Sequence, residues 1–251
     1  MIKRIKQGIA VVEQLRRGGV VNMNVLNYLE YEPNADILVF NDDLSRGLIV
    51  KFPDEEGYFV ATNDGEFLSQ FWSELDAGDK FFVCVPRLAA EVLISLSQGK
   101  TIWKSPCKTF IYDPEGQWNI VDDGKFPEAE MTLDDVLVVD EFYTYQNEGS
   151  AELFKKAVDA GYYSCVKADG EPVAWLLTHV EDGSLGPLYV KESHRGHKLG
   201  ELVTSRLVKK LVKKGKTPFL HIVETNTAAL GMLQKLPFKY THDVVWFGLK
   251  K

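Results

Sequence analysis

The sequence predicts an α/β protein with a mixed sheet, divided into two domains. Three observations support this. Apolar strand-like runs alternate with segments of helical period along the chain. The length of 251 residues is comfortable for two domains. A polar interval at 122–131, with Gly124 and Pro127, separates the halves. We therefore expect domains at 1–128 and 129–251.

The first half is predicted to mix helices with hairpins. The polar turns 41–46 and 113–116 each join two apolar runs, as in a hairpin. Asn63 or Asp64 is suited to cap a helix, and Gly99 to end one. The expected elements are helix 5–15, strands 36–40, 47–52 and 58–62, a helix from Asn63 or Asp64 to Gly78, strand 81–85, helix 88–98, and strands 109–112 and 118–121.

The second half gives a clearer pattern. Ser150 can cap a helix over 151–160 that Gly161 ends. Tight turns at 168–171 and 181–184 separate strands, which predicts three antiparallel strands in succession. The expected strands and helices that follow the first helix are strands 162–167, 172–180 and 185–190, a long helix from Leu199, strand 218–223, a helix from about Asn226 to Lys235, and strand 242–249.

The most informative stretch joins the strand ending at Val190 to the long helix. The turn between them carries Arg195, Gly196 and Gly200, and leucine and valine recur every four residues in the helix. A strand, a glycine-bearing turn and a helix start bring free backbone N–H groups and the positive end of the helix dipole to one point. That geometry binds phosphate groups.

This turn, Arg195-Gly-His-Lys-Leu-Gly200, resembles the Arg/Gln-x-x-Gly-x-Gly/Ala turn of the Gcn5-related N-acetyltransferase superfamily, which holds the coenzyme A pyrophosphate. Lys198 stands where the family usually has its first motif glycine. A second segment, 224–238, resembles the family's Asn-x-x-Ala-x-x-x-Tyr-x-x-x-Gly-Phe pattern. There Leu233 replaces a tyrosine that protonates the leaving thiolate in many members, and Pro237 replaces a glycine.

Two further segments, 139–150 and 170–175, are similar to motifs of the glycine N-acyltransferase-like, or FR47-like, branch. The resemblance covers about 139–251. It implies the acetyltransferase order of helix, three strands, helix, strand, helix and strand, and that branch has an extra N-terminal domain. The first half alternates strands and helices in a loosely similar order, which leaves open a second, degenerate copy of the fold.

The resemblance implies an acyl-CoA-dependent N-acyltransferase that uses acetyl-CoA as co-substrate, with no metal. It would transfer an acetyl or short acyl group, by direct attack, to the amine of a small molecule or amino acid. The residues expected to bind the cofactor are Leu188, Val190, Arg195, Gly196, His197, Lys198, Leu199, Gly200 and Asn226. For Asn226, a plain helix cap is the alternative.

The general base is open between Glu192, His221 and a water chain. In the glycine-conjugating branch a glutamate lies two residues before the arginine, where this chain has Ser193. Glu192 is the neighbour of Ser193. His221 alternates with Val223 along a strand, and an imidazole titrates in the pH range useful to a general base. The alternative functions are a non-catalytic protein that binds coenzyme A or a partner, and a two-domain scaffold that binds no nucleotide.

Composition excludes several classes. Net charge is −7, all of it from residues 1–128, while 191–216 carry nine basic residues against Glu192 and Glu201. A local positive patch suits a polyanionic ligand, but an acidic chain without a recognised motif disfavours nucleic acid. No apolar run approaches a membrane span, and we expect no signal peptide. Three scattered cysteines indicate reduced thiols in a cytoplasmic enzyme. Acceptor, acyl length and oligomeric state stay open.

Overall fold

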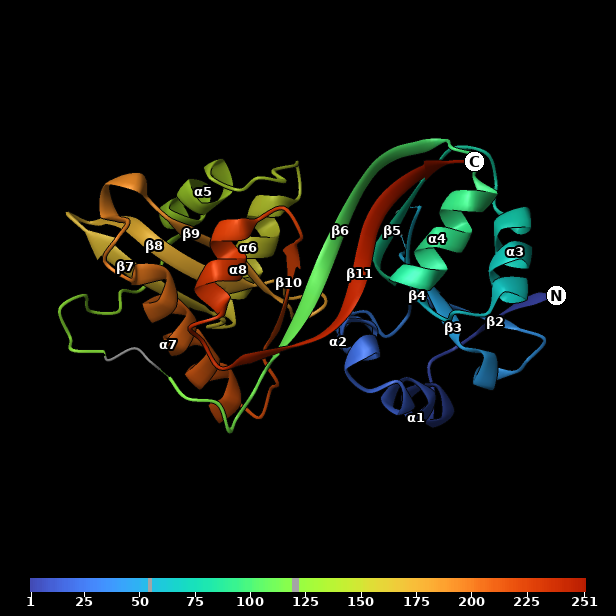
Figure 1. Ribbon diagram of the computed structural model, residues 1–251, viewed down its shortest axis with the longest axis horizontal. Coiled ribbons are helices and arrows are strands. Elements are labelled where there is room, and N and C mark those ends of the chain that lie inside the picture. The colour runs from blue at the N-terminus through green and yellow to red at the C-terminus, as the bar shows by residue number, and fades with distance from the viewer. Residues whose placement is uncertain (54–55, 119–121) are drawn as a thin grey trace. The chain divides into compact units, whose positions relative to one another are not determined.

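The computed structural model describes residues 1–53, 56–118 and 122–251, and its backbone divides into two compact units (Figure 1). The first unit comprises 1–109, 222–225 and 240–251, and the second comprises 110–221 and 226–239. The boundary expected near residue 128 thus lies inside the second unit. The last strand returns to the first unit for most of its length, so no single point along the chain separates the two units.

The first unit begins with a strand and two helices and continues as three strands, a helix, a strand, a helix and a strand. Asp64 caps the third helix by accepting a hydrogen bond from the Phe67 N–H at 2.9 Å. The elements are β1 (Ile2–Ile5), α1 (Ile9–Arg17), α2 (Met23–Tyr31), β2 (Asp36–Phe40), β3 (Leu48–Lys51), β4 (Gly57–Ala61), α3 (Gly65–Glu74), β5 (Asp79–Pro86), α4 (Arg87–Leu96) and β6 (Thr101–Tyr112).

The second half of the chain repeats that order without a leading strand, although most of its last strand lies in the first unit. Its longest helix, α7, buries the predicted stripe of Leu199, Val203, Leu207 and Leu211. The elements are α5 (Leu133–Glu141), α6 (Ser150–Asp159), β7 (Tyr163–Ala168), β8 (Glu171–Thr178), β9 (Leu185–Val190), α7 (Leu199–Lys213), β10 (Phe219–Val223), α8 (Thr227–Leu233) and β11 (Phe238–Lys250).

Within the described residues, the strands form two sheets. One has eight strands in the order β1-β2-β3-β4-β5-β11-β6-β10, and the other has three in the order β7-β8-β9. Neighbours from β1 to β4 are antiparallel, whereas β4 and β5 run parallel. In the second unit the corresponding strands, β9 and β10, lie in different sheets. The mixed-sheet α/β class expected from the sequence is therefore confirmed.

The differences from the expected elements have local causes. Strand β1 and helices α2 and α5 were not expected, although Thr132 and Asp135 form a capping box at the start of α5. Ser150 is not the cap of α6: Gly149 holds that place, and the Ser150 hydroxyl donates to Asp140. The strand expected at 118–121 falls largely outside the described residues, and Trp118 lies in no strand.

The two units have separate apolar cores. In the first, Phe82 stacks on Phe247 at 4.8 Å between ring centroids. In the second, Trp175 is fully buried and stacks on Tyr189 at 5.1 Å. Cys84, Cys107 and Cys165 are buried, as the sequence predicted for Cys84, and none of them forms a disulfide among the described residues. Among the described residues, no helix combines the length and apolar character that a membrane span requires.

Candidate functional site

Strand β9 offers a backbone edge that the rest of its sheet does not use. It is the last strand of the three-stranded order, and β8 lies on its other side. The Lys191 N–H donates to the Val173 carbonyl at 2.8 Å, so antiparallel alternation turns the backbone groups of Val190 and Leu188 toward the open edge. Both residues are half-buried. A ligand with amide groups could bind this edge as an extra strand would.

The turn after β9 presents backbone N–H groups without partners. Gly196 has φ +84°, which favours glycine, and Lys198 has φ +58°. Within the described part of the chain, the N–H groups of Gly196, His197 and Lys198 donate no hydrogen bond. Lys198 is the N-cap residue of α7, and its side chain caps nothing. The first N–H groups of the helix, from Leu199 and Gly200 onward, therefore also point outward.

Gly200 allows the start of α7 to approach its neighbours closely. A Cβ atom at this position would lie 3.0 Å from the Met232 sulfur and 3.7 Å from Val190 Cγ2. A larger side chain would move the first turn of α7 away from β9 and α8. The glycine of the motif thus keeps the outward N–H groups next to the open edge of β9.

Arg195 lies across this turn. Its Nε donates to the Val190 carbonyl at 3.3 Å, and its Nη1 forms an ion pair with Glu192 at 3.0 Å. The Glu192 side chain is 82% exposed, so the structure places this candidate base at the surface against a guanidinium. The His197 ring lies 5.9 Å from the Phe126 ring. Arg195 and Lys198 supply positive charge beside the outward N–H groups.

Asn226 lies at the start of α8. Its Oδ1 accepts a hydrogen bond from the Ala229 N–H at 3.1 Å, so the residue is a helix cap. Its amide Nδ2 donates to no described residue and stays available to a ligand carbonyl. Leu233 faces the interior with 3% exposure, and it has no proton to give.

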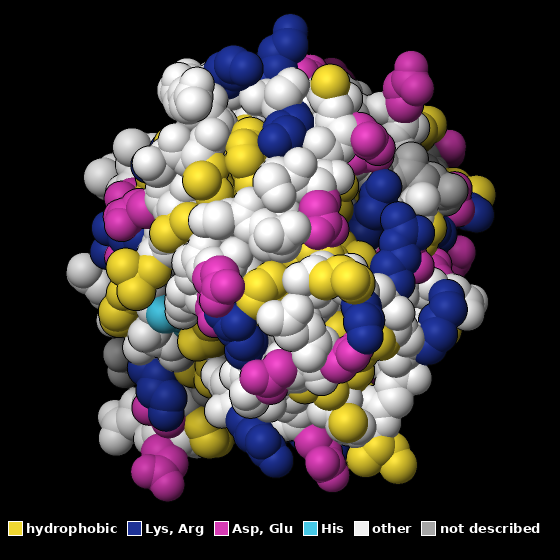
Figure 2. Space-filling model, turned by 90° about the vertical axis from the view of Figure 1, so that its right-hand side faces the viewer, with side chains coloured by type: hydrophobic (Ala, Val, Ile, Leu, Met, Phe, Trp, Pro, Cys, Tyr) yellow, Lys and Arg dark blue, Asp and Glu magenta, His cyan; other side chains and the backbone are white. Residues whose placement is uncertain are grey.

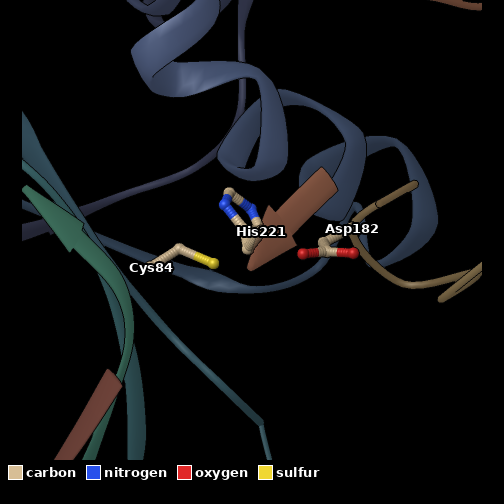
Figure 3. A group of neighbouring side chains, drawn as sticks. All are labelled: Cys84, Asp182 and His221. Atoms are coloured by element: carbon tan, nitrogen blue, oxygen red, sulfur yellow. The ribbon is translucent and has the colours of Figure 1, made fainter. Parts of the chain in front are cut away.

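His221 and Asp182 are drawn in Figure 3 and both belong to the second unit. His221 lies on β10 with its ring edge-on to Phe219, and Asp182 lies in the turn between β8 and β9. The Asp182 carboxylate and a ring nitrogen of His221 are within 4.8 Å of each other. Cys84, the third side chain drawn, belongs to β5 of the first unit. Asp182 was missed in the sequence because nothing in its local pattern relates it to β10.

The lysines of α7 do not all point freely into solvent. The Lys210 Nζ forms an ion pair with Glu128 at 2.9 Å and donates to the Tyr163 carbonyl. Lys214 donates to the Ala160 carbonyl at 3.0 Å. These lysines hold α7 against its own unit.

Figure 2 shows a different face of the molecule. On that face Lys and Arg side chains lie among Asp and Glu side chains, so no patch of one charge sign stands out.

Comparisons with known proteins bear on the fold. Residues 161–247 match the family model described as FR47-like protein. An X-ray structure of a Drosophila protein has a TM-score of 0.79 at 13% identity and covers 98% of both chains. A GCN5-related N-acetyltransferase from Sphaerobacter thermophilus has a TM-score of 0.67 at 12% identity, covering 99% of this chain and 95% of the other.

A tandem GNAT protein from the clavulanic acid biosynthesis pathway has a TM-score of 0.55 at 11% identity, over 100% of this chain and 98% of the other. A search of curated proteins gives no significant match. Likeness at such identities shows a fold, and here it extends over both units. The resemblance drawn from the sequence is thereby confirmed: the chain has the fold of the Gcn5-related N-acetyltransferase superfamily, and 161–247 match its FR47-like branch.

Proposed function

We propose that this protein is an N-acyltransferase that moves an acetyl or short acyl group from acyl-CoA to the amine of a small molecule or amino acid. One observation carries the proposal: the outward N–H groups between Gly196 and Gly200 lie at the end of β9, whose outer edge is open. A diphosphate needs the first feature, and the amide-bearing pantetheine arm needs the second. The superfamily fold supports pairing the two.

Binding would use these residues in order along the ligand. The diphosphate accepts hydrogen bonds from the N–H groups of 196–200, and Lys198 adds a charge-assisted contact. Arg195 exchanges its contacts with Val190 and Glu192 for a phosphate oxygen. The backbone of Leu188 and Val190 pairs with the pantetheine amides, and the Asn226 amide can donate to one of their carbonyls.

The chemistry follows as direct transfer. His221 accepts a proton from the acceptor ammonium, and the free amine attacks the thioester carbonyl. A backbone N–H on the open edge of β9 near Val190 donates to the oxyanion of the tetrahedral intermediate. The C–S bond then breaks, the amide forms, and the second nitrogen proton passes to solvent or to the thiolate. A thiol pKa of about 8.5 makes that thiolate a tolerable leaving group without the tyrosine that Leu233 replaces.

Glu192 is the second candidate base. It would have to leave the Arg195 ion pair when the cofactor binds. His221 is preferred because it is half-buried on β10, whereas Glu192 is exposed and paired with Arg195. The buried Leu233 favours the runner-up function, a protein that binds coenzyme A without turnover.

Isothermal titration with acetyl-CoA, followed by a free-thiol assay over a panel of amines, tests the proposal. We expect saturable binding and thiol release that depends on an amine. His221→Gln should lower kcat by about 100-fold, the usual contribution of a general base, while acetyl-CoA affinity stays unchanged. Binding without turnover for any amine would support the runner-up, and no binding would contradict both.

A further inference from the structure

The turn between β8 and β9 carries a carboxylate fixed in a single position. Asp182 is 5% exposed. Its Oδ1 accepts hydrogen bonds from the Ser184 N–H at 3.0 Å and the Ser184 hydroxyl at 2.7 Å. The turn is closed by the His179 N–H donating to the Ser184 carbonyl, and by the Gly183 N–H donating to the His179 carbonyl. A carboxylate held in this way has few alternative positions.

This turn leads directly into β9, the strand to which we assign the acyl-CoA. Its carboxylate lies within 4.8 Å of a ring nitrogen of His221 on β10 (Figure 3). Such a separation is spanned by a direct hydrogen bond after a small side-chain movement, or by one bridging water. Asp182 lies in the turn before β9, the edge strand of the three-stranded sheet, and His221 lies on β10, the edge strand of the eight-stranded sheet.

The electrostatic effect of Asp182 on imidazoles is visible at a second histidine. Burial lowers the pKa of His179, and the negative charge of Asp182 opposes that shift. A buried carboxylate stabilises a nearby imidazolium, because the local dielectric screens their attraction less than water does. The same carboxylate lies within 4.8 Å of a ring nitrogen of His221 on β10.

We propose that Asp182 is a positioning residue that orients the His221 imidazole and stabilises it once it carries the acceptor's proton. This inference rests on the proposed function, because His221 is the base of that reaction. Asp182 touches no reacting atom. The proton moves from the acceptor ammonium to the His221 nitrogen that faces the acceptor.

Steady-state kinetics give the first test. Asp182→Asn should lower kcat by about 10-fold or more, less than the roughly 100-fold loss for His221→Gln, and should leave the KM for acetyl-CoA unchanged. Because Asp182 acts through His221, adding Asp182→Asn to His221→Gln should cost little more. Asp169→Asn, at an exposed aspartate in the neighbouring β7–β8 turn, is the matched control and should change nothing.

NMR titration of the histidine rings gives a second test that needs no turnover. The His221 signal is assigned by its loss in His221→Gln. In Asp182→Asn the His221 pKa should fall by about one unit, since an opposite charge has been removed. Ser184→Ala, which loosens Asp182 but keeps its charge, serves if Asp182→Asn fails to fold, and should give a smaller shift in the same direction.

The outcomes separate the two proposals. If the wild type turns over but the Asp182 and His221 effects multiply independently, the positioning role is wrong and the acyltransferase stands. If the His221 pKa does not change in either variant, the pairing is wrong whatever the activity. A wild type without thiol release, together with a shifted His221 pKa, contradicts the proposed function and retains the Asp182–His221 contact.

Discussion

The two units contain the same strand–turn–helix, and they use it differently. In the first unit β4 leads into α3, and in the second β9 leads into α7. The N-cap of α3 is Asp64, whose carboxylate takes the Phe67 N–H and a bidentate ion pair from Arg46. The N-cap of α7 is Lys198, whose side chain caps nothing. The start of α3 is capped by its own chain, whereas the side chain of Lys198 leaves the start of α7 uncapped.

The strands that precede these helices, β4 and β9, also differ in how far neighbouring elements of the protein occupy them. β4 pairs with β5 in parallel register, and Glu56 just before β4 forms an ion pair with the buried Lys80 on β5 at 2.8 Å. The Tyr58 hydroxyl also donates to Glu56. β9 and β10 belong to different sheets. A helix start on this fold can therefore be capped by the protein's own side chains, as in α3, or left uncapped, as in α7.

Converting the second turn into the first is the change with the largest expected effect. Lys198→Asp places a carboxylate at the N-cap of α7, where aspartate tolerates the positive φ. We expect acetyl-CoA affinity to fall by about 100-fold, because the cap consumes an N–H group and repels the diphosphate. Isothermal titration measures this.

Lys198→Gly is its control, since it restores the family residue and removes only the charge. Its affinity should stay within about tenfold of the wild type. Equal losses in the two variants would show that the lysine charge, and not the open helix start, attracts the ligand.

The second-largest effect is expected on stability, when the β4–β5 pair of the first unit is weakened. Glu56→Gln leaves the Lys80 ammonium buried without a carboxylate, which costs about 2 kcal/mol of unfolding free energy because Glu56 is partly exposed. Urea unfolding measures it. Adding Lys80→Met should recover most of the loss. An unfolding free energy of Glu56→Gln equal to that of the wild type would mean that the Glu56–Lys80 ion pair does not stabilise the β4–β5 pair.

The same pair predicts a pH dependence. The hydrogen bond from Lys80 lowers the pKa of Glu56 from 4.5 to about 2. A carboxylate with a depressed folded-state pKa adds stability that is complete above pH 4.5 and is lost as the pH falls toward 2. Melting curves across that window should show a smaller loss in Glu56→Gln than in the wild type.

Removing the cap of α3 should have a smaller effect. Asp64→Ala deletes the cap and the Arg46 ion pair, at a cost of about 1–2 kcal/mol. A differential scan should show a lower Tm. Acetyl-CoA affinity should not change, since this turn is not the cofactor site, and a gain or loss of affinity would contradict the comparison.

The smallest effect is expected on the exposed face of α7. Lys213 is exposed, and among the described residues its side chain forms no ion pair or hydrogen bond. Lys213→Ala should change stability by less than about 0.5 kcal/mol and leave acetyl-CoA affinity unchanged. A clear loss of affinity would extend the cofactor site along this helix.

Local patterns were enough to predict most of the fold. The four-residue spacing from Leu199 to Leu211 marks a buried helix face, and tight turns mark the β7–β8–β9 meander. Helix α5 could have been found from its capping box at Thr132 and Asp135. Helix α2 was missed because no side chain caps its start.

The rest depends on contacts between distant segments. Nothing local in the sequence distinguishes the β4–β5 pair, which is hydrogen-bonded, from β9 and β10, which are not. The nearness of Asp182 to His221 also depends on strand order. The turn at 195–200 could be predicted because its glycines reflect local backbone geometry. The general base could not be predicted, because its surroundings depend on strand order.

The decisive measurement is a crystal structure with acetyl-CoA bound. We expect one ligand per chain, with its diphosphate on the N–H groups of 196–200 and its pantetheine arm along Leu188 and Val190. A diphosphate at the start of α3, or an empty turn after β9 at saturating acetyl-CoA, would contradict it.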